Sequence, residues 1–102
     1  MNVHDEDAAT ESWLIRVRGR VQGVGYRDAC VRHAQAVGIR GWVRNRADGS
    51  VELTLQGAPA NVAAMSAWLR HGVPGARVTD LDAKQLHAPF QNFDSFDRLP
   101  TQ

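Results

Sequence analysis

Cysteine is nearly absent from this chain of 102 residues, in which Cys30 stands alone. A single cysteine forms no disulfide within the chain and no paired-cysteine metal site. The four histidines are scattered, without the HxxxH or HExxH spacing that binds zinc. We therefore expect no metal and no cofactor. On the helical periodicity around it, Cys30 is expected to be a small buried packing residue rather than a nucleophile.

Long hydrophobic runs are also missing. No apolar stretch approaches the roughly 20 residues that a membrane span needs. The first twelve residues, MNVHDEDAATES, are acidic and lack the apolar segment of a secretory signal. We expect a cytoplasmic protein with no membrane partner, made of a disordered acidic tail at 1–12 and one domain at 13–102. Nothing in the sequence demands more than a monomer.

Lysine is scarce, because eleven of the twelve basic residues are arginine. Eight of these arginines lie between residues 16 and 46, where Asp28 is the one acid. Planar guanidinium groups suit the recognition of phosphate, and a concentration of positive charge attracts anionic ligands. A solvated basic surface explains the same pattern, so the charge alone decides nothing.

Hydrophobic periodicity predicts the element order β-α-β-β-α-β, followed by a short edge strand or a docked tail near Phe93 and Phe96. An Asp-Gly pair predicts a tight turn between the second and third strands, which should pair antiparallel. This order is typical of the ferredoxin-like α+β sandwich, an antiparallel sheet with two helices on one face. The expected elements are strands at 13–20, 39–46, 51–57 and 76–86, and helices at 26–37 and 59–71.

Alternation along the third strand places Val51, Leu53 and Leu55 inward. The polar residues between them, Glu52, Thr54 and Gln56, are then expected to point outward. In the first turn of the first helix, Asp28 is expected to complement the helix dipole.

The stretch GRVQGVGYR, residues 19–27, joins the first strand to the first helix. Gly23 and Gly25 allow backbone N–H groups to converge, and the helix N-terminus that follows attracts an anion. Arg27, in the first helical turn, can add a charge-assisted fork to a phosphate. The spacing matches neither GxGxxG nor GxxxxGK[ST]. The residues alone leave a phosphate site and a plain tight turn about equally open.

Asn45 lies on the inward face at the end of the second strand, where a polar amide needs a partner. It can satisfy backbone groups in the adjoining turn. Topology offers another role, because the two strands of a βαβ unit are parallel and end at the same edge of the sheet. Arg27 and Asn45 are then neighbours, and together they can bind a phosphate and orient a water without a strong base.

Two segments closely resemble the signature segments of the acylphosphatases, namely VRGRVQGVGYR at 17–27 and GWVRNRADGSVELTLQG at 41–57. The resemblance extends from about residue 13 to 98. It implies a ferredoxin-like fold and metal-independent hydrolysis of acyl phosphates, small-molecule substrates whose phosphate product, or another oxyanion, can inhibit. The C-terminal sequence FDSFDRLPTQ departs most from the vertebrate enzymes and leaves the register of the last strand open.

The resemblance also implies roles for individual residues. Arg27 is similar in position to the phosphate-binding arginine of the family, and Asn45 to the residue that holds the attacking water. Backbone N–H groups of the cradle are implied for Gly23, Val24, Gly25 and Tyr26. The implied mechanism is direct attack of this water on phosphorus, without a phosphoenzyme.

RNA-recognition domains share the expected element order, but they carry stacking aromatic residues on the third strand. That strand reads VELTLQ here, so we expect no nucleic-acid partner. A catalytically idle acylphosphatase-like module of a larger maturation protein is the remaining alternative. The presence of both Arg27 and Asn45 favours an enzyme.

Overall fold

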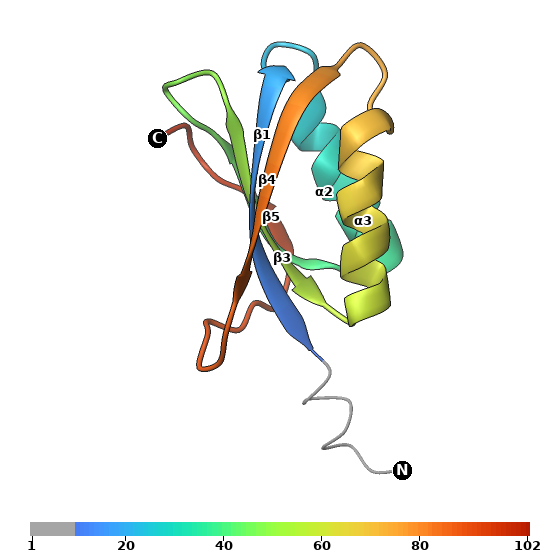
Figure 1. Ribbon diagram of the computed structural model, residues 1–102, viewed down its shortest axis with the longest axis vertical. Coiled ribbons are helices and arrows are strands. Elements are labelled where there is room, and N and C mark those ends of the chain that lie inside the picture. Colours follow the sequence, from blue (N-terminus) through green and yellow to red (C-terminus); the bar gives the residue numbers. More distant parts are fainter. Residues whose placement is uncertain (1–9) are drawn as a thin grey trace.

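Two helices cover one face of a five-stranded sheet in the computed structural model, which describes residues 10–102 (Figure 1). The strand order is β4-β1-β3-β2-β5, and the predicted ferredoxin-like α+β fold is confirmed. The elements are β1 (Glu11–Arg20), α2 (Tyr26–Val37), β2 (Arg40–Asn45), β3 (Val51–Gly57), α3 (Pro59–His71), β4 (Arg77–Leu86) and β5 (Phe96–Arg98).

The central strand β3 pairs antiparallel with both β1 and β2. Val51 is the partner of Val17 on one side and of Asn45 on the other. Because β1 and β2 both oppose β3, they are parallel to one another and end at the same edge of the sheet. This relationship brings the loop after β1 next to the end of β2.

The start of the first strand and the pairing of the last strand differ from the prediction. β1 begins at Glu11, two residues earlier than expected, because Glu11 and Ser12 pair with Gly57 and Gln56. The preceding part of the predicted tail, residues 1–9, lies outside the described residues. At the other end, β5 pairs parallel with β2, which makes the sheet mixed rather than wholly antiparallel. A strand of three residues carries too little periodicity to be distinguished from a docked tail.

The core lies between the helices and the sheet. Ile15, Leu53 and Leu55 are fully buried there, and so is Cys30, as predicted. The Tyr26 hydroxyl donates a hydrogen bond of 2.7 Å to the carbonyl oxygen of Leu69, which joins α2 to α3. This bond turns the Tyr26 side chain into the core and leaves only its backbone near the loop.

Trp68 of α3 is half-buried and packs against the edge of the core. Its ring stacks on His33 of α2, with 3.9 Å between ring centroids and 2° between planes. Gly72 allows this position, because a Cβ there would lie 2.2 Å from the indole.

Among the described helices, none is long and apolar enough to cross a membrane.

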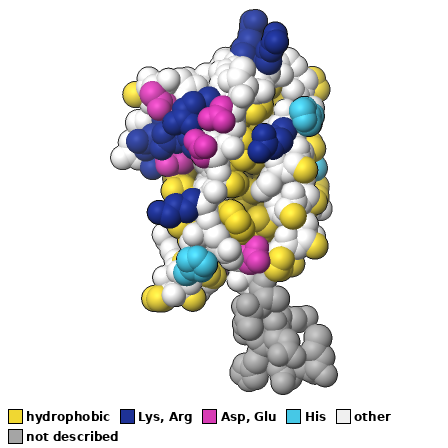
Figure 2. Space-filling model, in the orientation of Figure 1, with side chains coloured by type: hydrophobic (Ala, Val, Ile, Leu, Met, Phe, Trp, Pro, Cys, Tyr) yellow, Lys and Arg dark blue, Asp and Glu magenta, His cyan; other side chains and the backbone are white. Residues whose placement is uncertain are grey.

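On the face of the sheet away from the helices, more side chains are paired or buried than the sequence indicates. Figure 2 shows basic and acidic side chains intermingled over the strands rather than a purely basic surface. Arg18, for example, forms a 2.9 Å ion pair with Asp82. Arg16, Arg44 and Arg46 surround Glu52, which explains why this carboxylate is buried despite pointing outward.

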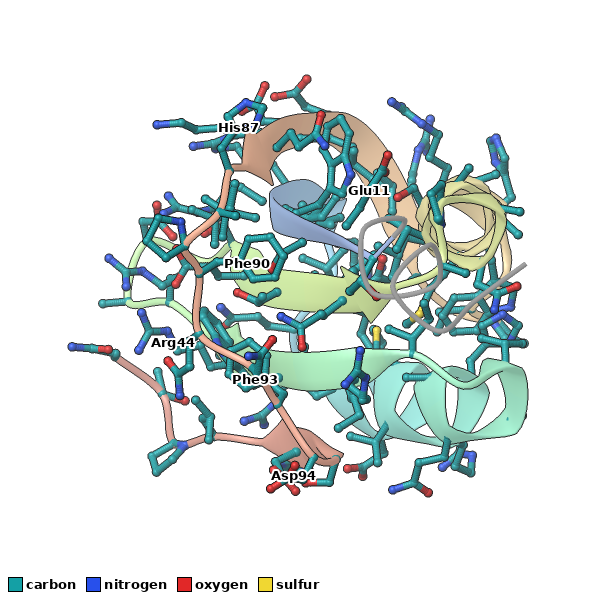
Figure 3. All side chains as sticks on the ribbon, turned by 90° about the horizontal axis from the view of Figure 1, so that it is seen from below. Glu11, Arg44, His87, Phe90, Phe93 and Asp94 are labelled. Carbon is teal, nitrogen blue, oxygen red and sulfur yellow. The ribbon has the colours of Figure 1, made fainter. Side chains whose placement is uncertain are left out.

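The segment between β4 and β5 crosses the same face, as the course of the chain through Phe90 and Phe93 shows (Figure 3). Gln56 holds this segment: its amide donates to the carbonyl of Gln91 at 2.7 Å and accepts from the N–H of Phe93 at 3.0 Å. Gln56 points outward as predicted, but the crossing segment covers it and leaves it fully buried. Thr54 is buried as well.

Candidate active site

The glycine-rich loop at 21–25 connects β1 to the N-terminus of α2. Gly23 and Gly25 adopt left-handed conformations, with φ of 74° and 77°. No atom lies within 4 Å of a Cβ built at either position, so the backbone conformation rather than crowding requires glycine. Gly25 is also the N-cap of α2 and supplies no side chain to cap it. The N–H groups of the first turn are therefore available to a ligand.

A pocket of about 220 Å³ opens at this loop. It gathers residues from the loop, the first turn of α2, the end of β2 and β5. The pocket is lined by Val21, Gln22, Gly23, Gly25, Tyr26, Arg27, Asp28, Asn45 and Arg98. Of the residues predicted for the site, only Val24 is missing from this lining, because it is half-buried and packs against the core.

Arg27 and Asn45, eighteen positions apart in the sequence, line the same pocket. Within residues 10–102 the Arg27 guanidinium forms no hydrogen bond or salt bridge, and the neighbouring carboxylate of Asp28 pairs with Arg98 instead. The cation is thus available to an anion that enters the pocket.

Asn45 is 8% exposed, and its Oδ1 atom is buried without a hydrogen-bond partner among the described residues. The alternative role of satisfying the adjoining turn is filled by Asp48, which accepts hydrogen bonds from the backbone N–H and hydroxyl of Ser50. An orphaned buried acceptor at the wall of a pocket is a place where a water can be bound.

Four residues that line this pocket were not predicted for the site, namely Val21, Gln22, Asp28 and Arg98. Gln22 donates hydrogen bonds of 2.9 Å to the carbonyl oxygens of Arg46 and Ser50, in the turn after β2. Arg98, on β5, donates a hydrogen bond of 2.6 Å to Asp28. That hydrogen bond and the charge of Arg98, with smaller effects of Arg32 and Arg27, lower the pKa of Asp28. Nothing in the local sequence around Gln22 or Arg98 indicates these contacts.

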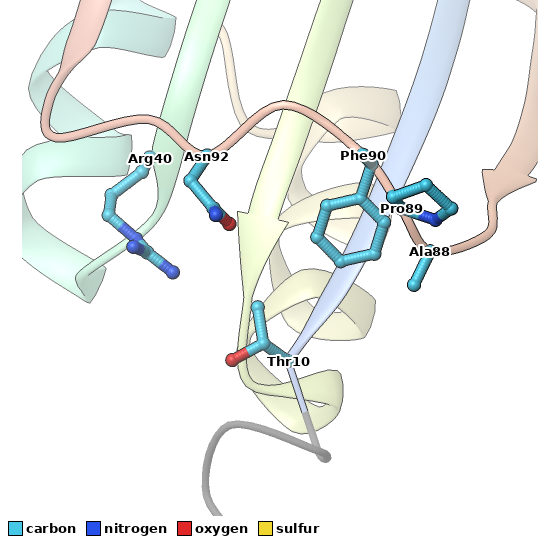
Figure 4. Close-up of a pocket in the computed structure, with 6 residues that line it drawn as sticks. All are labelled: Thr10, Arg40, Ala88, Pro89, Phe90 and Asn92. Atoms are coloured by element: carbon cyan, nitrogen blue, oxygen red, sulfur yellow. The ribbon is translucent and has the colours of Figure 1, made fainter.

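A larger pocket, of about 550 Å³, lies at the opposite end of β2 and beneath the crossing segment (Figure 4). Arg40, Phe90 and Asn92 contribute to its wall. It contains none of the predicted site residues. No group of three or more His, Cys, Asp or Glu residues among residues 10–102 is arranged to bind a metal ion.

Comparison with known proteins gives a consistent result. The acylphosphatase family matches residues 13–97. Acylphosphatase 1 of Ralstonia nicotianae is 54% identical over 101 residues, which cover 99% of either chain. The structure of an acylphosphatase from Coxiella burnetii superposes with a TM-score of 0.86 at 26% identity, over 92% of this chain and 97% of that one. The crystal structure of acylphosphatase from Bacillus subtilis superposes with a TM-score of 0.83 at 30% identity, over 87% of this chain and 98% of that one. The chain therefore belongs to the acylphosphatase family of hydrolases, which act on acid anhydrides.

Proposed function

We propose that the pocket shared by Arg27 and Asn45 hydrolyses acyl phosphates, with a water held by Asn45 attacking phosphorus directly. One observation carries this proposal: a guanidinium and a buried amide oxygen, both without a partner among residues 10–102, line the same small pocket at a helix N-terminus.

The phosphoryl group is bound by two kinds of donor. Backbone N–H groups of residues 23–27 and the positive end of the α2 dipole receive its oxygens. The Arg27 guanidinium adds a charge-assisted fork. Because inorganic phosphate offers the same oxygens, it should compete with the substrate as a product inhibitor.

The water is held by Asn45. Its Oδ1 accepts a hydrogen bond from the water, which orients the oxygen lone pair toward phosphorus. As the P–O bond to water forms, the bond to the acyl oxygen breaks, and the carboxylate leaves with the electron pair. One proton of the water passes to a phosphoryl oxygen, so the products are a carboxylate and dihydrogen phosphate. A carboxylate is a good leaving group, so positioning and charge stabilisation are sufficient.

Hydrolysis of benzoyl phosphate in the presence of EDTA tests the proposal. Arg27→Ala should lower turnover by at least about 10²–10³-fold, the range for loss of one transition-state donor. Asn45→Ala should lower kcat strongly while the inhibition constant for phosphate changes by less than about twofold, because the water rather than the phosphate is lost. Arg70→Ala serves as the matched control, since it removes an exposed cation of α3 outside the pocket.

Three results would contradict the proposal or part of it. Near-normal turnover in Arg27→Ala removes Arg27 from the mechanism. A large loss of phosphate affinity in Asn45→Ala moves Asn45 from water binding to phosphate binding. No turnover by folded wild-type protein rejects the hydrolysis of acyl phosphates altogether.

A further inference from the structure

The phosphate pocket contains a carboxylate in an unfavourable place. Asp28 follows Arg27 in the first turn of α2, and its side chain lines the pocket in which we place the phosphoryl group. A carboxylate there complements the helix dipole but repels a phosphate dianion. Its pKa is lowered, so the group is negatively charged near neutral pH. The mechanism described above makes no use of it.

Arg98 neutralises this carboxylate from another part of the chain. Its Nη1 atom lies 2.6 Å from Oδ1 of Asp28. β5 positions Arg98 by pairing with β2 at Val43, and the N–H of Leu99 donates a hydrogen bond of 2.8 Å to the Val43 carbonyl. Arg27, Asp28 and Arg98 are the charged side chains that line the pocket. Together they carry a net charge of +1, which would fall to zero without Arg98.

We propose that Arg98 maintains the affinity of the pocket for phosphoryl groups by neutralising Asp28, and that it does so without itself binding the substrate. Arg98 is thus a positioning residue that acts through the charge of Asp28. This inference rests on the proposed function, because it assumes that the phosphoryl group lies beside Arg27.

Two other roles are open to the pair, and each predicts a different set of phosphate affinities. If the ion pair only braces β5 against α2, removing either partner should have the same effect. If Arg98 binds phosphate directly, removing it should weaken binding whether or not Asp28 is present. A brace is disfavoured from the outset, because the two side chains are 46% and 56% exposed and such ion pairs contribute little to stability.

The test is a double-mutant cycle of Arg98→Ala and Asp28→Asn, read out as the inhibition constant of inorganic phosphate against benzoyl phosphate at low salt. The net charge of the pocket becomes zero in Arg98→Ala, +2 in Asp28→Asn and again +1 in the double variant. We expect phosphate to bind about fivefold more weakly in the first and about fivefold more tightly in the second, on the order of one added or removed charge a few ångströms away in water. The double variant should return to within about twofold of wild type.

Two controls separate charge from geometry. Arg98→Lys keeps the charge without the planar guanidinium and should bind phosphate nearly as wild type does. Arg32→Ala removes a cation one turn further along α2, outside the pocket lining, and should change phosphate affinity by less than about twofold. Raising the salt concentration toward 1 M should reduce all the differences, because charges are then screened over about 3 Å.

The decisive result is that the two single variants change phosphate affinity in opposite directions. Equal weakening by Arg98→Ala and Asp28→Asn would overturn the inference in favour of a brace. A double variant as weak as Arg98→Ala would overturn it in favour of direct binding by Arg98. Arg27→Ala, measured in the same assay, separates this inference from the proposed function. If phosphate inhibition is lost in Arg27→Ala but is unchanged in all three variants of Arg98 and Asp28, the proposed function stands and the role of Arg98 is rejected.

Discussion

The side-chain amide of Gln22 donates a hydrogen bond of 2.9 Å to the backbone carbonyl oxygen of Arg46. A second bond from the same nitrogen, also 2.9 Å, reaches the carbonyl of Ser50. The two acceptors belong to the turn that follows Asn45. One side chain therefore fastens the loop proposed to bind phosphate to the strand end proposed to hold the water.

We predict that Gln22→Ala lowers both stability and turnover. Losing the two hydrogen bonds should reduce the free energy of unfolding by about 1–2 kcal/mol, measured by urea denaturation. Because the loop is then free to shift relative to Asn45, kcat should fall at least about tenfold. Gln35→Ala, an exposed glutamine on α2, is the matched control and should change neither quantity. Unchanged turnover in Gln22→Ala would show that the loop is positioned by other contacts.

Much of the candidate site could be predicted because it follows from local patterns. The period of two along β2 places Asn45 on the inward face, and the helical first turn contains Arg27. The parallel relation of β1 and β2 then brings these residues to one edge of the sheet. Each of these steps needs only the alternation of a few neighbouring residues and a rule of chain topology.

The rest depends on how segments far apart in the sequence dock, which no local pattern reports. Arg98 reaches Asp28 because β5 pairs with β2, seventy positions after the carboxylate. Gln56 is buried because the irregular segment at 87–95 crosses it, although its alternation alone indicates an exposed position. Irregular segments have no hydrophobic period, so neither their path nor the residues they cover can be read from the sequence.

Gly25 should be replaceable only by a residue that tolerates the left-handed conformation. Its φ is 77° and the space around it is open, so Gly25→Ala introduces conformational strain of about 1–2 kcal/mol and no clash. We expect Gly25→Ala to lose this amount of stability. We also expect its kcat/KM to fall, because the strain is relieved by moving the loop. Gly25→Asn should retain more of both, since Asn adopts this conformation more readily.

Gly38→Ala is the matched control for Gly25. Gly38 ends the same helix with a φ of 75° and equally open surroundings, but it does not line the pocket. The free energy of unfolding should fall by a similar amount while kcat/KM stays near wild type. Equal losses of activity in the two alanine variants would mean that strain anywhere in α2 disturbs the site.

Cys30 should take no part in catalysis. Burial raises the pKa of its thiol to about 12, and the side chain is fully buried in the core. Iodoacetamide should therefore leave the native protein unmodified and react only after unfolding, as mass spectrometry can measure. Cys30→Ala should keep turnover within about twofold and lower stability by about 1 kcal/mol, the order expected for loss of one small buried group. Rapid alkylation that abolishes activity would refute this assignment.

Glu52 should make the stability of the fold depend on pH. Burial opposes its ionisation, but hydrogen bonds from Arg44 and Arg16 and the charges of Arg44 and Arg46 outweigh that effect and lower its pKa. A carboxyl group with a lowered pKa in the folded state stabilises the fold above its unfolded pKa of about 4.3. The contribution is lost as the pH falls through the lower folded value.

Glu52→Gln should consequently cost about 2 kcal/mol of unfolding free energy at pH 7, the scale of hydrogen bonds to a charged group. The difference in unfolding free energy between variant and wild type, measured by urea titrations across pH 3–8, should stay constant down to about pH 5. Below that pH it should decrease steadily. Asp80→Asn is the control, because that carboxylate is 58% exposed and pairs with Arg18 at 3.6 Å, so its removal should cost less than about 1 kcal/mol at any pH. A gap that persists undiminished at pH 3 would assign the loss to packing around Glu52 rather than to its charge.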